Sequence, residues 1–240
     1  VSSNGPSLVC CLYYMSYMSF YTRRFVMEQF TIRKNDFLSH DCTGYFHLYY
    51  VGYGQPGNPD YLNTLKNIFV STHPDTLRAA SRQAAALMIQ DIPQIMDAEG
   101  VDEAVLMAVP RSKSGMCNWQ LGFKAAVRTA VKALQDNNLP IIDGTDFIFR
   151  HTSTKMTHLR KPVSNFENTG SEPYPGITKD TCDIQNEYLK GRMVILIDDI
   201  YTKTVNVDED CIQALYDAGA ARVIFYAVAY TNRNAYKRGA

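Results

Sequence analysis

Short, continuously apolar runs alternate with amphipathic stretches in the second half of the chain. The clearest runs are AVLMAVP at Ala104–Pro110, MVILI at Met193–Ile197 and VIFYAVAY at Val223–Tyr230. Such runs are typical of strands buried on both faces, and strands separated by helices form βαβ units. The pattern therefore predicts an α/β fold with a mainly parallel, twisted sheet and helices on both faces.

Other segments fill in this architecture. DFIFR at Asp146–Arg150 is expected to be a further strand of the same sheet, and FHLYYVGY an N-terminal strand. One helix is expected to begin near Pro74, with Asp75 as its N-cap. A second should bury a stripe that includes Trp119, and DEDCIQALYDAGA should form a third that ends near Gly219.

The 240 residues suffice for one large domain or a domain with a small appendage. Residues 1–26 contain an apolar run, LVCCLYYMSYMSFY, that is shorter than the roughly 18–20 residues needed to span a bilayer. We interpret 1–26 as a non-native or variable extension. The alternative is an amphipathic tail that covers an apolar surface. Residues 27–100 are expected to form an N-terminal hood and helical region, and 101–240 a core with a flexible loop at 151–190.

Composition excludes some classes of protein. The 24 basic and 24 acidic residues balance, which disfavours a nucleic-acid binder that relies on bulk positive charge. The six cysteines show neither CxxC pairs nor zinc spacing, so reduced thiols and a cytoplasmic location are expected. No segment predicts a membrane span.

The stretch MVILIDDIYTKTVN carries the most chemistry. Asp198 and Asp199 stand where an apolar strand is expected to end, and the loop Tyr201–Asn206 leads into a helix. Ligands of open α/β sheets bind beyond the carboxyl ends of the strands, and helix N-termini favour phosphate. Vicinal sugar hydroxyls suit the two carboxylates, and a phosphate suits the Thr, Lys and Asn donors of the loop. A ribose 5-phosphate ester would satisfy both. A structural helix-capping role for the carboxylates is the alternative.

These residues resemble the type I phosphoribosyltransferase family, whose signature is an apolar strand, two acidic residues and a T-T-G-x-T-like phosphate loop. The resemblance covers about Asp102–Tyr230. Within it, RHTSTKMTHLRK looks like the corresponding loop of ComF-like and amidophosphoribosyltransferase-like members. It implies a parallel core with a hood subdomain, and 5-phosphoribosyl pyrophosphate as substrate. It also implies Mg²⁺ near Asp198 and Asp199, and transfer of phosphoribose to a nitrogen acceptor. Dimers are frequent among similar proteins, so a homodimer is a further expectation.

The resemblance also assigns site residues. Asp198 and Asp199 would be the catalytic acidic pair. The loop AVPRSKSG stands at the place of the pyrophosphate loop, so Arg111, Ser112, Lys113 and Ser114 would bind pyrophosphate. The residues that would bind the 5′-phosphate are Tyr201, Thr202, Lys203, Thr204, Val205 and Asn206.

The phosphate loop departs from the family pattern. Alignment places Lys203 on the second Thr, Thr204 on the Gly and Asn206 on the final Thr. A β-branched residue disfavours the positive φ or close backbone approach that Gly permits. We therefore expect Thr204→Gly with Asn206→Thr to tighten phosphate binding. A non-catalytic regulatory or nucleotide-sensing module is the alternative function, and the acceptor is open among purines, pyrimidines, ammonia and other amines.

Overall fold

The computed structural model of the chain describes residues 27–157, 159, 164 and 166–232. The expected extension at 1–26 lies outside these residues, so neither interpretation of it is tested. His158, Arg160 and Lys161 of the long polar segment also lie outside the described residues.

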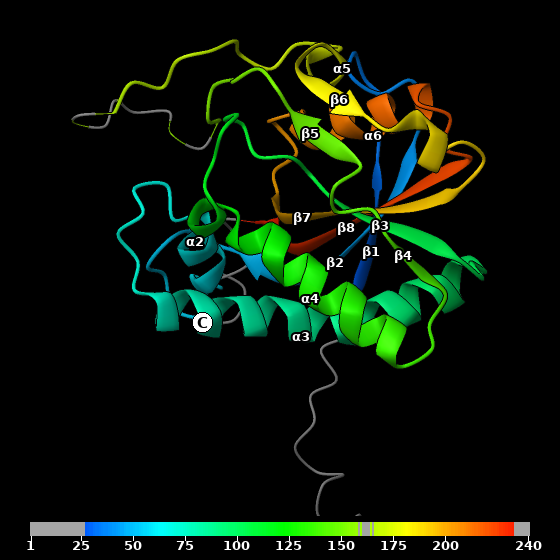
Figure 1. Cartoon of the computed structure of the whole chain (residues 1–240), viewed down its shortest axis with the longest axis horizontal. Helices are drawn as coiled ribbons and strands as arrows, with labels where there is room; N and C mark the ends of the chain where they lie inside the picture. The colour runs from blue at the N-terminus through cyan, green and yellow to red at the C-terminus, as the bar shows by residue number, and fades with distance from the viewer. Residues whose placement is uncertain (1–26, 158, 160–163, 165, 233–240) are drawn as a thin grey trace, which may run out of the picture.

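A six-stranded sheet forms the centre of the molecule, with strand order β1-β2-β8-β7-β3-β4 (Figure 1). β1 is antiparallel to β2, and the other neighbouring pairs are parallel. The three apolar runs form β3, β7 and β8, which are neighbours in the sheet and are buried along most of their length. The expected mainly parallel sheet is thus confirmed. The strands are β1 (Glu28–Ile32), β2 (Cys42–Tyr50), β3 (Ala104–Ala108), β4 (Ile141–Asp143), β7 (Met193–Tyr201) and β8 (Arg222–Thr231).

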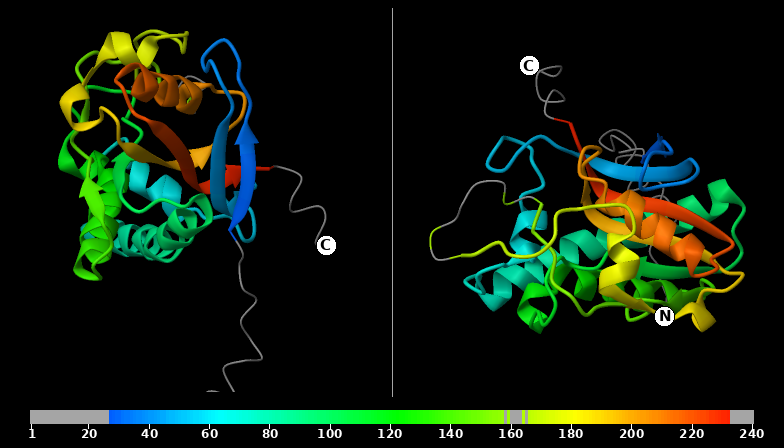
Figure 2. Two further views of the ribbon diagram at one scale, coloured as in Figure 1. Left: turned by 90° about the vertical axis from the view of Figure 1, so that its right-hand side faces the viewer. Right: turned by 90° about the horizontal axis from the view of Figure 1, so that it is seen from above.

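Helices cover both faces of this sheet (Figures 1 and 2). On one face, Met88 of α3 and Val127 of α4 belong to the same apolar cluster as Ile195 of β7. On the other face, Leu215 of α6 packs with Phe225 of β8. None of the described helices is both long enough and apolar enough to cross a bilayer. The helices are α2 (Tyr61–Lys66), α3 (Pro74–Glu99), α4 (Gly122–Asp136), α5 (Ile177–Thr181) and α6 (Val207–Asp217), with 3-10 turns η2 (Asn118–Gln120) and η3 (Asn186–Tyr188).

Two helix starts differ from the sequence prediction. Trp119 does not belong to the buried stripe of α4. It lies in η2 and is 49% exposed. α4 begins only at Gly122, where a Cβ would lie 3.1 Å from the backbone oxygen of Leu65, so the chain packs tightly against α2 at that point. α3 is capped by His73 rather than by Asp75, because the His73 ring accepts the N–H of Asp75.

The prediction that Asp146–Arg150 joins the main sheet is wrong. β5 (Ile148–Arg150) pairs antiparallel with β6 (Cys182–Ile184) in a separate two-stranded sheet. β4, three residues long, takes the expected place beside β3. The chain leaves β4 at Gly144, where a Cβ would lie 2.5 Å from Cγ1 of Val105. The chain turns directly afterwards, where the N–H of Thr145 donates to Oδ1 of Asp143 and the N–H of Phe147 donates to the backbone oxygen of Gly144.

Two strands of the expected N-terminal hood region, β1 and β2, belong to the main sheet. β2 pairs in parallel with β8 from Gly44 to Tyr50, and β1 completes that edge. The expected flexible loop at 151–190 is also partly regular, because α5, β6 and η3 lie within it. α5 contacts α6, so the second half of this segment belongs to the layer that covers the sheet.

Candidate functional site

A cavity of about 820 Å³ lies at the carboxyl ends of β3 and β7. Val109 and Pro110 line it from the chain that follows β3, and Asp198 and Asp199 line it from β7. This is the edge of a parallel sheet at which ligands of open α/β folds bind. Its volume falls within the range of roughly 300–1,000 Å³ that is typical of small-molecule sites.

The acidic pair lies within β7 rather than after it. β7 pairs with β8 as far as Tyr201, whereas its pairing with β3 ends at Ile197. The strand therefore continues beyond the predicted end at Ile197, and in this part it pairs with β8 but not with β3. Because β3 has already ended, the carboxylates of Asp198 and Asp199 face the cavity.

The two carboxylates have different partners. Oδ2 of Asp199 lies 3.4 Å from Nζ of Lys66, and both side chains are largely buried. Burial and then the neighbouring Asp199 raise the pKa of Asp198 to about 7. Lys66 comes from α2 and was not among the predicted site residues. No sequence signal links it to the acidic pair, because the contact depends on how α2 packs.

Asp208 adds a third carboxylate that the sequence analysis did not assign to the site. It lies in the first turn of α6 and lines the same cavity as Asp198. Its Oδ1 is buried and has no partner among the described residues. Burial and then Asp198 raise the pKa of Asp208 well above its ordinary value. The acidic run DED at the start of the predicted helix was the signal that could have identified it.

The predicted pyrophosphate loop, which follows β3, lines the same cavity. Arg111, Ser112, Lys113 and Ser114 all contribute to the lining. Burial lowers the pKa of Arg111, although the charges of Asp199 and Asp198 act in the other direction. Nζ of Lys113 donates to the backbone oxygen of Thr169, which lies in the long polar segment. The structure thus brings this loop and the acidic pair to one cavity.

The base of the long segment is attached to the same loop. Thr154 donates its N–H to the backbone oxygen of Ser112 at 2.7 Å. Ser114 donates its N–H to Oγ of Ser153 at 3.1 Å. Lys155 lines the cavity and pairs with Glu172 at 2.7 Å. His151 is exposed and is not among the lining residues.

Arg150 is a second cation that sequence reasoning missed. It is 8% exposed, lines the cavity and donates from Nε to the backbone oxygen of Arg111 at 2.5 Å. Nη1 donates to Oγ1 of Thr181. Among the described ion pairs, neither Arg150 nor Arg111 has an acidic partner within 4.0 Å. Two largely buried guanidinium groups without a direct counterion favour an anionic ligand.

Residues of the predicted phosphate loop line two different cavities. Thr202 and Val205 line the cavity, and Oγ1 of Thr202 is hydrogen-bonded to Thr231. Tyr201 and Lys203 instead line a smaller, separate cavity. Thr204 is exposed and lines neither cavity.

Asn206 carries the positive φ of this loop. Its φ is 59°, and it is the N-cap residue of α6. Thr204, which aligns with the glycine of the family pattern, is not among the residues with positive φ. Asn tolerates the left-handed region better than other non-glycine residues do. The predicted strain at Thr204 is therefore absent, because the turn places its left-handed residue two positions later.

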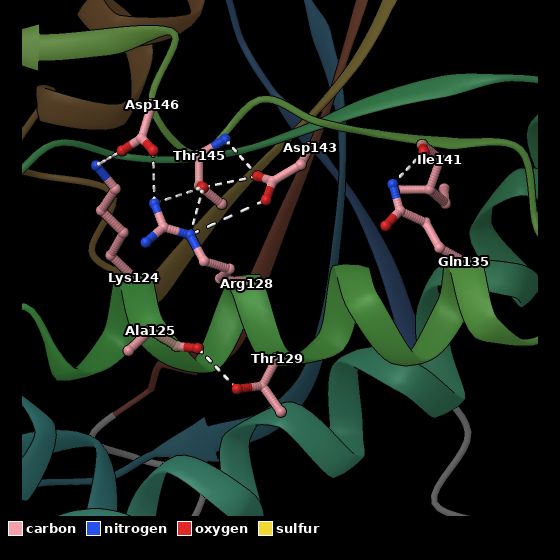
Figure 3. A network of polar contacts seen from close by, with 9 residues as sticks. All are labelled: Lys124, Ala125, Arg128, Thr129, Gln135, Ile141, Asp143, Thr145 and Asp146. Atoms are coloured by element: carbon pink, nitrogen blue, oxygen red, sulfur yellow. Dashed lines mark hydrogen bonds and ion pairs between the residues drawn. The ribbon is translucent and has the colours of Figure 1, made fainter.

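A polar network fixes the wall that follows β4 (Figure 3). Lys124 and Arg128 of α4 contact the two carboxylate oxygens of Asp146, each at 2.7 Å. Arg128 also donates to Oγ1 of Thr145, which in turn donates to Asp143. Thr145 and Lys124 line the cavity, so this network holds the loop after β4 at its rim.

The carboxylates that line the larger cavity could serve as ligands for Mg²⁺. In the part of the chain that the structure describes, no three His, Cys, Asp or Glu side chains are grouped as a metal site. Mg²⁺ is usually held by one or two carboxylates together with water and substrate phosphates. Asp198, with the unpartnered Asp208 oxygen beside it, fits such a partial site, whereas Asp199 already has Lys66 as its cation.

Comparisons with known proteins add little. No family model matches the chain, and no curated protein matches it. A solved structure, described as the "structure of the allosteric regulatory enzyme of purine biosynthesis", aligns with 62% of this chain at 16% sequence identity and a TM-score of 0.30. The alignment covers 25% of the length of that protein, so the chain spans about a quarter of it. A likeness of this size assigns neither a family nor an activity.

Proposed function

We propose that the chain binds 5-phosphoribosyl pyrophosphate with Mg²⁺ and transfers phosphoribose to a nitrogen acceptor. The observation that carries the proposal is that acidic and basic side chains line one cavity. Asp198 and Asp199 line it from β7, and the cationic loop Arg111–Ser114 lines it from the neighbouring parallel strand β3. The sequence resemblance to type I phosphoribosyltransferases agrees with this arrangement.

The binding chemistry follows from the two sets of groups. Carboxylates accept hydrogen bonds from vicinal ribose hydroxyls, so Asp199 and Asp198 would hold the sugar. Arg111, Arg150 and Lys113 would hold the pyrophosphate, because guanidinium and ammonium groups are its natural donors. Mg²⁺, held by Asp198 together with substrate oxygens, would supply further charge neutralisation for the leaving group.

The residues would promote transfer by position and charge. The transition state of such a transfer carries positive charge on the sugar and negative charge on the departing pyrophosphate. With the sugar at Asp198 and Asp199 and the pyrophosphate at the arginines, both charges would be stabilised in place. Phe123, Ile148 and Met156 supply apolar lining that would help to exclude water.

A non-catalytic module that binds the same ligand is the second candidate. Lys203 points to a different cavity, and Asp208 places a third carboxylate beside the loop that would cradle the 5′-phosphate. Both features weaken phosphate binding at this loop, because a phosphate needs donors and positive charge there.

Calorimetry with the full chain tests the proposal. We expect 5-phosphoribosyl pyrophosphate to bind more tightly with Mg²⁺ than with EDTA. Asp198→Asn with Asp199→Asn should weaken binding at least about tenfold, the scale of one lost charged hydrogen bond. Asp102→Asn is the matched control, because Asp102 is exposed and lies before β3, at the other end of the strand. Binding that is unchanged in the double variant would remove the assignment.

Turnover separates the two candidates. Pyrophosphate release should be measured with purine bases, pyrimidine bases, ammonia and primary amines as acceptors. Release that depends on one acceptor and is lost in the double variant supports the transferase. Tight binding without release from any of them selects the non-catalytic module.

A further inference from the structure

A second cavity of about 300 Å³ lies on the other side of the loop that follows β7. Its lining residues come from the β1 region, from β7 and β8 and from the start of α6. None of them lines the larger cavity. The volume is at the lower end of the roughly 300–1,000 Å³ typical of small-molecule sites, which restricts an occupant to about the size of one nucleotide.

Aromatic rings form one wall of this cavity. The ring centroid of Phe30 lies 5.0 Å from that of Tyr201 and 5.1 Å from that of Tyr230. The two tyrosine rings are 5.4 Å apart. The rings are inclined to one another by 43° to 82°, and Tyr201 is only 3% exposed. The half-buried rings of Phe30 and Tyr230 are therefore the ones that can offer a π-face to a nucleobase.

Glu209 lines the cavity with an unsatisfied acceptor. Its side chain belongs to α6 and the residue is 2% exposed. Oε1 accepts a hydrogen bond from the Tyr201 hydroxyl at 2.8 Å. Oε2 is buried and has no partner among the described residues. A buried carboxylate oxygen without a donor is costly, so an N–H group from a ligand would be bound favourably there.

Basic side chains form an exposed part of the smaller cavity's lining. Arg33, Lys34 and Lys203 line the cavity and are all exposed. Arg33 is paired with Asp41 at 2.6 Å, whereas the ammonium groups of Lys34 and Lys203 take part in none of the described ion pairs. Exposed ammonium groups at the rim suit the phosphate of a ligand whose base lies deeper.

We propose that this cavity binds a nucleoside monophosphate whose base carries an N–H donor. The base stacks on the half-buried ring of Phe30 or Tyr230 and donates to Oε2 of Glu209. The phosphate lies at the rim with Lys34 and Lys203. This site is distinct from the larger cavity and does not depend on the function proposed for it.

The loop between the two cavities would respond to an occupant. Thr202 lines the larger cavity, and the next residue, Lys203, lines the smaller one. In the same way, Asp208 lines the larger cavity and Glu209 the smaller one. Asn35 of the smaller cavity donates to Oδ1 of Asn206 at 3.1 Å. A nucleotide held by Lys203 and Glu209 should therefore slow hydrogen exchange of the backbone amides at 203–210.

Calorimetry of the full chain with AMP, GMP, CMP and ribose 5-phosphate tests this site. At least one nucleotide should bind, and ribose 5-phosphate should bind at least about tenfold more weakly because it lacks the stacking base. Glu209→Gln keeps the size of the side chain and should weaken nucleotide binding about tenfold by replacing an acceptor oxygen. Lys203→Ala changes an exposed residue and should weaken binding severalfold and reduce its salt dependence. Lys179→Ala is the matched control, since Lys179 is exposed and lines neither cavity.

The binding results support or overturn the nucleotide site as follows. Weaker binding in both Glu209→Gln and Lys203→Ala, with Lys179→Ala unchanged, supports the site. If these two variants bind as the wild type does and Asp198→Asn with Asp199→Asn abolishes binding, the nucleotide occupies the larger cavity and the proposal is overturned. Failure of all three nucleotides to bind at millimolar concentration also overturns it.

Discussion

Asn206 shows how one residue changes the interpretation of a loop. Its backbone has φ 59°, and its side chain accepts a hydrogen bond from Asn35. The family pattern suggested that Thr204 lacked a necessary glycine, yet the left-handed position is Asn206. Restoring the family residues would therefore place a β-branched residue at the one position of this loop that disfavours it.

We expect Asn206→Thr to destabilise the protein by about 1–2 kcal/mol, the cost of left-handed backbone for a residue with a branched Cβ. Asn206→Gly should be nearly neutral, because glycine adopts this conformation without strain. Thr204→Gly should bring no gain, since Thr204 has no positive φ. Urea unfolding monitored by circular dichroism measures all three. Equal midpoints for the Thr and Gly variants at 206 would contradict this account.

Asp198 should make stability depend on pH. Its folded pKa of about 7 exceeds the unfolded value of about 3.9. The folded state therefore binds more protons between these values, and the free energy of unfolding should fall as pH rises from about 4 to about 7. Asp198→Asn should flatten this slope by up to about 1.4 kcal/mol per pH unit, the value for one proton. Burial and the neighbouring Asp198 also raise the pKa of Asp208, so part of the slope should persist in the variant.

Urea unfolding in EDTA at several pH values provides the measurement, and Asp102→Asn is the control that should keep the wild-type slope. An identical slope in wild type and Asp198→Asn would show that this carboxyl group does not bind the extra proton.

Among the elements, the short strand β4 and the loop after it set one wall of the larger cavity. The loop is held by the contacts of Asp146 and Thr145 to α4 (Figure 3). Gly144 is in close contact with β3. A Cβ at Gly144 would lie 2.5 Å from Cγ1 of Val105 and 2.8 Å from Cγ of Met107. Side chains in the core cannot yield so much space without strain.

Gly144→Ala should therefore destabilise the protein by about 1–3 kcal/mol, the usual cost of overpacking. Val105→Ala removes the nearest methyl group, so the double variant should be less destabilised than the sum of the single changes. A double-mutant cycle by denaturant unfolding measures this coupling. Additive effects would mean that the contact between Gly144 and Val105 does not limit the loop.

At the scale of the whole molecule, the N-terminal strands and the C-terminal core form one sheet. β2 pairs with β8, which is itself paired with β7. The central strands β8, β7 and β3 are buried along most of their length, whereas β1 and β4 are the sheet edges. Stability should therefore be highest in these central strands.

Native-state hydrogen exchange tests this distribution. Amides of β7 and β8 should exchange only through global unfolding, because opening them requires loss of both apolar clusters. Amides of β2 should be protected nearly as well, whereas β1 should exchange faster. Fast exchange throughout β2 would show that the N-terminal strands are an independent, weaker unit.

The sequence alone predicted the parallel core and placed the acidic pair at the end of an apolar run, although β7 extends past the pair to Tyr201. Buried strands appear as continuous apolar runs, and ligand sites of such sheets lie where those runs end, so Ala104–Ala108, Asp198 and Asp199 could be identified from local pattern. Arg111 to Ser114 were assigned through the family resemblance, and their lining of the same cavity agrees with that expectation.

Only the tertiary structure decided which other groups join the site. Lys66 and Arg150 come from α2 and β5, which are distant in sequence from the acidic pair, and no local pattern reports how these elements pack. Asp208 had a local signal in the acidic run DED, but only the packing of α6 brings it to the cavity. The separate pairing of β5 with β6 was likewise not evident from local pattern. Residue pattern encodes burial along one element, whereas contacts between elements depend on the packing of the whole chain.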